Sequence, residues 1–257
     1  MAWVQGARAF SSIAIDLAIV VVWGIIDSRA IAPARWPTFR PWCALALIPV
    51  AYWQADRIIT APPHGSYELS WIALDVRILT DWGLQTAIEA SGRIVPALLE
   101  LAYACVYVAP VVTLGLVRWL GDDTAIERFL GVLLLGTLAA YSLLPLFPSS
   151  SPRVAFPSIV PPPVDTPIRY FNIWVLEHLD IAGSVFPSGH VAAVWSTVFG
   201  ARLALRARWL TAALAVFAAV TTLATLYGRY HYAVDALAGT SIAVAALWLQ
   251  HARLHTR

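Results

Sequence analysis

The sequence predicts an all-α fold, a polytopic bundle of helices that crosses a membrane. Of the 257 residues, 60% are hydrophobic and only 12% are charged, whereas soluble domains carry roughly 25% charged residues. The mean hydropathy is +0.71. The apolar residues also gather in runs long enough, or nearly so, to cross ~30 Å of hydrocarbon at ~1.5 Å per residue. Together these observations indicate an integral membrane protein.

The clearest spans are five apolar runs that follow residue 93. They cover residues 94–117, 130–147, 191–205, 209–227 and 236–250. Two earlier runs, 12–26 and 42–53, are shorter. We expect six core transmembrane helices, with a seventh at the N-terminus if both early runs cross. Asp16 interrupts the first run, so we expect an uncleaved membrane segment there rather than a signal peptide.

A different pattern occupies residues 55–93, where charged and aromatic residues mix. Four large apolar side chains recur there at helical spacing with charged residues between them: Trp71, Leu74, Ile78 and Trp82. This pattern is typical of an amphipathic helix that lies at the membrane interface. We therefore divide the chain into N-terminal membrane segments with this helix (1–93) and a helix bundle (94–257), to which the motifs described below belong.

The long connection between residues 148 and 187 begins with a proline-rich stretch that excludes a continuous helix. Further along, Thr166 followed by Pro167 predicts a helix start, with threonine as the N-cap and proline at the first helical position. The expected helix, 167–180, has two interpretations. It is either a lid over the functional site or a plain interfacial helix within a loop.

The distribution of arginine predicts how the chain is oriented, because the sequence contains no lysine. With the spans above, ten of the 17 basic residues fall on one face, mostly in short loops, and seven on the other. The positive-inside rule makes the first face cytoplasmic. The two motifs described next then lie on the outer face.

Two short motifs carry the candidate chemistry, and each stands beside an apolar run: Phe186-Pro187-Ser188-Gly189-His190 and Arg229-Tyr230-His231-Tyr232-Ala233-Val234-Asp235. His231 and Asp235 are one helical turn apart, so the carboxylate can hold the imidazole in one tautomer and orientation. Ser188 and Gly189 lie just ahead of a helix, whose free N–H groups and dipole attract an anion. A nucleophilic histidine, an orienting carboxylate, a second histidine and an anion cradle are the parts of a phosphoryl-transfer site.

On these residues the chain resembles the type 2 phosphatidic acid phosphatase superfamily. The resemblance is closer to the branch that contains bacterial relatives of inositol phosphorylceramide synthases. It runs from about residue 42 to the C-terminus. Pro187-Ser188-Gly189-His190 matches the second motif of the family without change, and His231 and Asp235 match the third. The usual arginine of that third motif would fall at Thr225 and is missing, so Arg229 is expected to replace it. The first motif keeps only Pro152-Arg153.

The resemblance implies a membrane-embedded lipid phosphate phosphatase that works through a phosphohistidine intermediate and needs neither a cofactor nor a metal ion. His231 is then the nucleophile, Asp235 its orienting partner, and His190 the general acid and base. Four further residues are expected to bind the phosphate oxygens: Arg153, Ser188, Gly189 and Arg229.

Two other functions stay open at this point. One is a head-group phosphotransferase of the inositol phosphorylceramide synthase type, and the other is a non-catalytic lipid-binding or transport protein. The expected partners are a lipid phosphate substrate and membrane lipids, and no basic cluster suggests nucleic acid. The sequence leaves the oligomeric state open. The expected location is the bacterial plasma (inner) membrane, with the site facing outward or toward the periplasm.

Four polar residues inside apolar runs need separate interpretations. Cys43 and Cys105 are expected to be small packing residues, and they indicate neither a disulfide nor a metal site. Glu100 and Asp16 are either functional or merely paired inside the bundle.

Overall fold

A computed structural model describes residues 36–59, 66–181 and 183–256. In these ranges the chain is all-helical and contains no strand, which confirms the predicted fold class. The early run 12–26, with Asp16, lies outside the described residues. The α-helices are α2 (Trp36–Ile58), α3 (Ser66–Val76), α4 (Leu84–Glu89), α5 (Ile94–Ala104), α6 (Ala109–Leu120), α7 (Asp123–Leu143), α8 (Pro152–Ala155), α9 (Pro167–Leu179), α10 (Gly189–Ala204), α11 (Arg208–Tyr227) and α12 (Ala233–His255).

Three helices in the described part are long and apolar enough to cross a membrane. They are α7 with the 3-10 turn that extends it (Asp123–Leu146), α11 and α12. The helices α5 and α6 pass the same test only together, as one span that is bent by 62° at a short break between them. If this pair is counted as one span, there are four. The expectation of an integral membrane protein is confirmed at this level.

The predicted continuous span 94–117 was wrong in one respect, because the helix is interrupted. A 3-10 turn at Cys105–Tyr107 separates α5 from α6. Pro110 stands in the first turn of α6, where it has no N–H to donate and its ring clashes with the carbonyl four residues earlier. The break therefore follows from the sequence, and it places Tyr107 at the bend.

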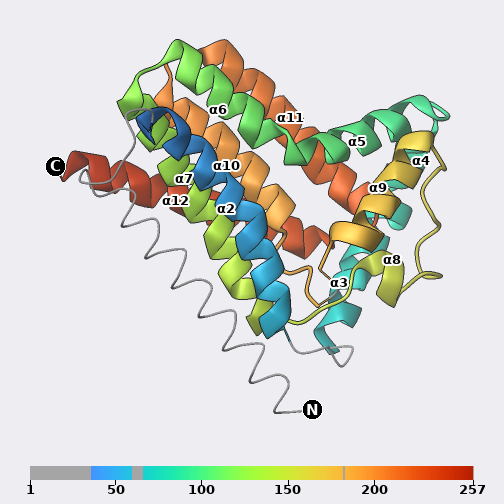
Figure 1. Cartoon of the computed structure of the whole chain (residues 1–257). Coiled ribbons are helices and arrows are strands. Elements are labelled where there is room, and N and C mark those ends of the chain that lie inside the picture. Colours follow the sequence, from blue (N-terminus) through green and yellow to red (C-terminus); the bar gives the residue numbers. More distant parts are fainter. Residues whose placement is uncertain (1–35, 60–65, 182, 257) are drawn as a thin grey trace.

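Helix α10 is the centre of the bundle and packs against α6, α7, α11 and α12. Figure 1 shows α6, α7, α10 and α11 side by side, with α12 crossing them at an angle and α2 lying along α7. At one end, on the right in Figure 1, the short helices α3, α4, α8 and α9 gather around α5 and the last turns of α11. The short helices therefore cover only one end of the bundle.

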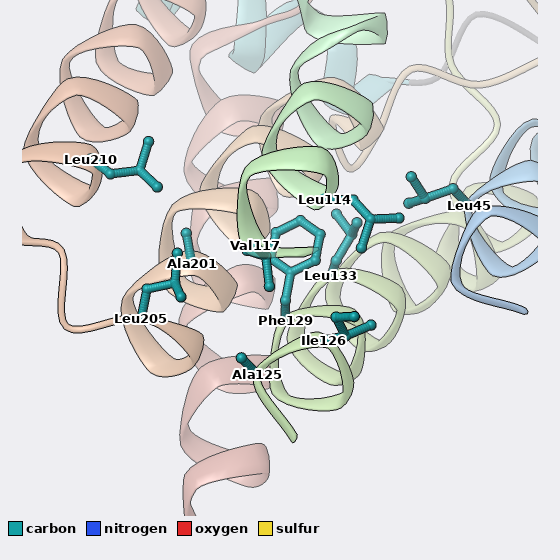
Figure 2. Close-up of a cluster of buried hydrophobic side chains, with 10 residues drawn as sticks. All are labelled: Leu45, Leu114, Val117, Ala125, Ile126, Phe129, Leu133, Ala201, Leu205 and Leu210. Carbon is teal, nitrogen blue, oxygen red and sulfur yellow. The ribbon is translucent and has the colours of Figure 1, made fainter. Parts of the chain in front are cut away.

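The core at the other end is apolar and closely packed. Figure 2 shows the cluster, in which Phe129 and Leu133 of α7 meet Leu114 of α6, and all three side chains are fully buried. Packing of this kind holds helices together inside a bilayer, where the surrounding lipid is as apolar as the side chains. The buried cluster at this end consists of hydrophobic residues alone, so the candidate chemistry lies elsewhere in the bundle.

Of the region 55–93 the structure describes residues 55–59 and 66–93, and the helix expected over residues 71–82 is present in two segments. Its place at a membrane interface stays a prediction. α3 continues into a π-helical segment, Arg77–Asp81, and the chain then turns at Gly83, whose φ of +71° lies in the left-handed region. The predicted helix start at Thr166 and Pro167 is confirmed, because the Thr166 hydroxyl accepts a hydrogen bond from the Arg169 N–H at 3.1 Å. α9 packs against α5.

Candidate active site

The two sequence motifs meet where the N-termini of α10 and α12 come together. The backbone N–H of Ser188 donates to the backbone carbonyl of Asp235 over 3.1 Å. The Ser188 side chain caps α10 by accepting from the Val191 N–H at 3.3 Å. Gly239 allows this contact, because a Cβ at that position would lie 2.5 Å from the carbonyl oxygen of Ser188.

Glycine is also required at position 189. A Cβ there would lie 2.5 Å from Cε1 of the Tyr141 ring, a separation that two carbon atoms cannot adopt without displacement of the ring. Gly189 begins α10 and borders the cavity described below. The backbone N–H groups at this helix start can therefore approach an anion closely.

His231 has both ring nitrogens engaged and is 6% exposed. Its Nδ1 lies 3.0 Å from the carbonyl oxygen of Val185 and 3.3 Å from Oδ2 of Asp235. Its Nε2 lies 3.2 Å from Nδ1 of His190. The pairing of His231 with Asp235 predicted from their spacing is present, and the second histidine stands directly beside it.

The neighbours of the two rings fix one consistent set of proton positions. Val185 and Asp235 offer only acceptors to Nδ1 of His231, so this nitrogen carries the proton and Nε2 keeps a free electron pair. His190 then donates from Nδ1 to His231. The remaining nitrogen of His190, Nε2, lies 3.1 Å from the hydroxyl of Tyr107, which donates to it. The free electron pair is what a nucleophilic histidine requires.

A second carboxylate holds the motif in place from outside the bundle. Oδ2 of Asp235 accepts from the backbone N–H of Tyr232 at 2.9 Å, and Oδ1 of Asp75 in α3 accepts from that of Ala233, also at 2.9 Å. Both N–H groups lie at the start of α12, where a negative charge is favourable. Burial nevertheless raises the pKa of Asp75 to about 7, because the carboxylate loses hydration.

The Arg229 guanidinium is engaged by backbone carbonyls, and the phosphate-binding role expected for it stays a prediction. Its side chain is buried, and its φ of +62° is unusual for a residue with a side chain. The guanidinium donates to four backbone carbonyls of the segment 152–160: those of Pro152, Phe156, Pro157 and Val160. The side chain is long enough to reach all four. Because proline has no backbone N–H, the carbonyls of a proline-rich loop have few backbone donors, and the guanidinium takes their place.

Arg153 is held next to Arg229 by a backbone hydrogen bond. Its backbone N–H donates to the carbonyl of Arg229 over 3.2 Å, which fixes the short helix α8 against the third motif. Its side chain is half-buried, and Nε has no hydrogen-bond partner within the described part of the chain. It lies near enough to Asp180 to favour the charged form of that carboxyl.

Glu100 is paired inside the bundle, which is one of the two interpretations its position allowed. It forms an ion pair with Arg169 at 2.9 Å. Its other oxygen accepts from Asn172 at 2.7 Å and from the Tyr230 hydroxyl at 2.6 Å. Because Tyr230 precedes His231, this network ties the motif to α5 and α9.

Both histidines open onto a cavity of about 630 Å³. The cavity extends along α2 and α6, where its lining is apolar: Trp42, Leu45, Ala46, Ile48, Pro49, Pro110 and Val111. At the histidine end it is lined by Tyr52, Tyr107, Tyr141, Asp180, Ser184 and Val185. Val175 and Leu179 of α9 also border it, so this helix forms part of the cavity wall. An amphiphile with its head group at the histidines fits this distribution.

Sequence reasoning missed Tyr107, Asp75 and Asp180. A signal existed for Tyr107, a hydroxyl three residues ahead of a helix-breaking proline inside an apolar run. Asp180 fell at the end of a predicted helix and Asp75 in the amphipathic pattern, and neither position distinguishes them from surface carboxylates. Cys43 and Cys105 are free thiols. In the ranges described, no three His, Cys, Asp or Glu side chains are grouped to hold a metal ion.

Comparison with known families agrees with this geometry. A family model described as the PAP2 superfamily matches residues 70–249, which include both motifs, Tyr107 and Arg153. The match covers well over half of the chain, and the chain therefore belongs to the PAP2 superfamily. Searches of curated proteins and of solved structures found no match.

Proposed function

We propose that this member of the PAP2 superfamily is a membrane-embedded phosphatase that removes the phosphate of an amphiphilic substrate through a phosphohistidine intermediate. One observation carries the proposal. The unprotonated Nε2 of His231 stands 3.2 Å from Nδ1 of His190 at the polar end of an otherwise apolar cavity. Membership of the superfamily supports phosphatase or phosphotransferase activity.

The first step is attack of His231 Nε2 on phosphorus. The P–N bond forms as the bond from phosphorus to the leaving oxygen breaks, and protonated His190 gives its Nδ1 proton to that oxygen. Asp235 and the Val185 carbonyl hold the Nδ1 proton of His231 and stabilise the positive charge that develops on its ring.

The second step reverses the roles. A water molecule attacks phosphorus, its proton passes to Nδ1 of His190, and the P–N bond breaks to restore His231. Through both steps Nε2 of His190 keeps its proton and donates to the Tyr107 hydroxyl, whereas in the neutral resting ring, with its proton on Nδ1, the hydroxyl donates to Nε2 instead. Arg153 and the N–H groups at the start of α10 are proposed to bind the equatorial oxygens.

We further propose six core spans, formed by α2, the α5–α6 pair, α7, α10, α11 and α12, with the site at the outer face of a bacterial plasma membrane. The arginine distribution supports this orientation. The substrate reaches the site sideways from the lipid, with its chains along α2 and α6, where the cavity is apolar.

Head-group transfer to an alcohol is the second candidate, and one observation favours it. The Arg229 guanidinium donates its hydrogen bonds to backbone carbonyls, and the described residues that line the cavity include no arginine. A phosphomonoester carries up to two negative charges and a phosphodiester only one, so a site with few cations suits the diester better. In that reaction an alcohol replaces water in the second step, as the resemblance to inositol phosphorylceramide synthases suggests.

The test is a turnover assay on the purified protein in detergent, with a lipid phosphomonoester and a lipid phosphodiester, each with and without an acceptor alcohol. Free phosphate from the monoester supports the phosphatase, and a new phosphodiester supports transfer. Rapid quenching should trap a phosphoenzyme that is labile in acid and stable in alkali, and His231→Ala should trap none. Lack of turnover on every lipid would leave the non-catalytic lipid-binding alternative.

A further inference from the structure

The wall of the cavity contains a carboxyl group that the mechanism does not use. Asp180 follows the last turn of α9 and lines the cavity together with both histidines. Its Oδ1 accepts a hydrogen bond from the Tyr52 hydroxyl of α2. The backbone N–H of Ile181 also donates to the carboxyl, and His231 and Arg153 lie near enough to favour its charged form. Among the ion pairs of the described residues, none includes Asp180.

A carboxylate is an unexpected neighbour for a phosphate. Two negative groups at the same end of an apolar cavity repel each other, and the repulsion is strong where few water molecules screen it. Burial already raises the pKa of the Asp180 carboxyl, because the site solvates the charged form poorly. A substrate that carried only negative charge would increase that cost.

A purely structural role explains Asp180 poorly. The adjacent residues Trp53 and Leu179 already join α2 to the end of α9 without a charged group. The indole N–H of Trp53 donates to the Leu179 carbonyl at 2.9 Å. An uncharged side chain at position 180 could accept from Tyr52 equally well. The carboxylate therefore points to a ligand that uses its charge.

The surroundings of Asp180 indicate which ligand this is. Tyr52 and Tyr141 pack with their ring centroids 5.1 Å apart, and Tyr107 lines the same end of the cavity. Tyrosine ring faces attract cations, and aromatic rings with a nearby carboxylate are a recurrent site for ammonium groups. The phosphate and the ammonium of a zwitterionic head group would balance the charges of this end of the cavity.

We propose that Asp180, with the rings of Tyr52, Tyr107 and Tyr141, forms a subsite for the ammonium group of a zwitterionic phosphodiester lipid. This rests on the second candidate function, head-group transfer from a phosphodiester, because it takes the phosphate of the diester to be held at His231 and His190. The ammonium group then lies next to Asp180 in the cavity wall, and the acyl chains lie along the apolar lining of α2.

The test measures binding separately from turnover, with His231→Ala protein in a maltoside detergent. Short-chain phosphatidylcholine and the phosphatidylglycerol with the same chains are titrated calorimetrically. The subsite predicts about tenfold tighter binding of the zwitterionic lipid, the size expected of a desolvated cation beside aromatic rings. Asp180→Asn should abolish this preference, and Tyr52→Phe, which keeps the carboxylate, should retain most of it.

The two proposals fail in different ways. Equal affinity for both lipids, or tighter binding of phosphatidylglycerol, overturns the ammonium subsite even if the wild-type protein turns over a lipid phosphate. A clear preference for phosphatidylcholine in a wild-type protein that turns over no lipid supports the subsite and overturns the enzymatic function. The comparison of two lipids on protein with an unaltered Asp180 needs no folded Asp180 variant.

Discussion

The backbone N–H of Ser188 donates to the backbone carbonyl of Asp235 over 3.1 Å, which joins the N-termini of α10 and α12. Ser188 stands two residues before His190 and Asp235 four residues after His231. One main-chain hydrogen bond thus sets the register between the two histidines. The 3.2 Å contact between their rings depends on the backbone of both motifs.

Replacing His231 by alanine should abolish turnover, because the attacking Nε2 is lost and the unprotonated nitrogen of the neighbouring His190 is engaged by the Tyr107 hydroxyl. Asp235→Asn should lower kcat by as much as ~10⁴, the loss seen when the orienting carboxylate of a serine-protease triad is removed. Steady-state kinetics measure both, and the far-UV circular dichroism of each variant should match the wild type. More than a few per cent of residual activity in His231→Ala would show that another residue is the nucleophile.

Tyr107→Phe removes one hydroxyl while keeping the ring. His190 then lacks the acceptor that stabilises its charged form, so the pH–rate profile should change in the limb that reports the protonation of His190. A neutral hydrogen bond contributes about 0.5–1.5 kcal/mol, which corresponds to a several-fold loss of kcat with little change in KM. Tyr141→Phe is the matched control, since none of the hydrogen bonds that the described residues make to the two histidines comes from its hydroxyl. A pH profile identical to the wild type would exclude this role for Tyr107.

The sequence was sufficient for features that depend on local chemistry. The start of α9 at Thr166-Pro167 and the pairing of His231 with Asp235 both follow from short-range rules of capping and helical spacing, and both are present. Contacts between distant segments were not predictable in this way. No local pattern shows that Arg229 reaches carbonyls some 70 residues earlier in the chain, or that Asp75 caps a helix 158 residues later.

Arg229→Lys should destabilise the segment 152–160 rather than weaken phosphate binding alone. A lysine ammonium carries its three N–H groups on one nitrogen and cannot bond all four carbonyls, so at least one of them loses its partner. We expect a lower Tm and faster proteolysis within this segment. Arg77→Lys, at an exposed arginine, is the control and should change neither. An unchanged Tm with a large loss of turnover would instead support the phosphate-binding role.

Activity should survive EDTA, because the proposed steps draw their positive charge from Arg153, helix N–H groups and the histidines. Vanadate should inhibit, since it forms a five-coordinate species that resembles phosphorus under attack by His231. The assay is turnover at several EDTA concentrations, followed by a vanadate titration with wild-type and Arg153→Gln protein. The variant should require more vanadate. A strict requirement for Mg²⁺ would contradict the mechanism.

The final prediction concerns the buried carboxyl of Asp75. Its pKa is about 7 in the folded protein and about 3.9 in an unfolded chain. Between these values the folded state binds more protons than the unfolded state, so the free energy of unfolding contributed by this group falls as pH rises from about 4 to about 7. Asp75→Asn keeps an oxygen that accepts from Ala233 but cannot become charged. The variant should therefore gain stability relative to the wild type as pH rises through this window, by at most about 4 kcal/mol. Thermal unfolding of both proteins in the same detergent, at pH 4.5, 6 and 8, measures this difference and cancels the titration of the other carboxyls. A difference that is constant across the three pH values would show that Asp75 does not change its protonation on folding.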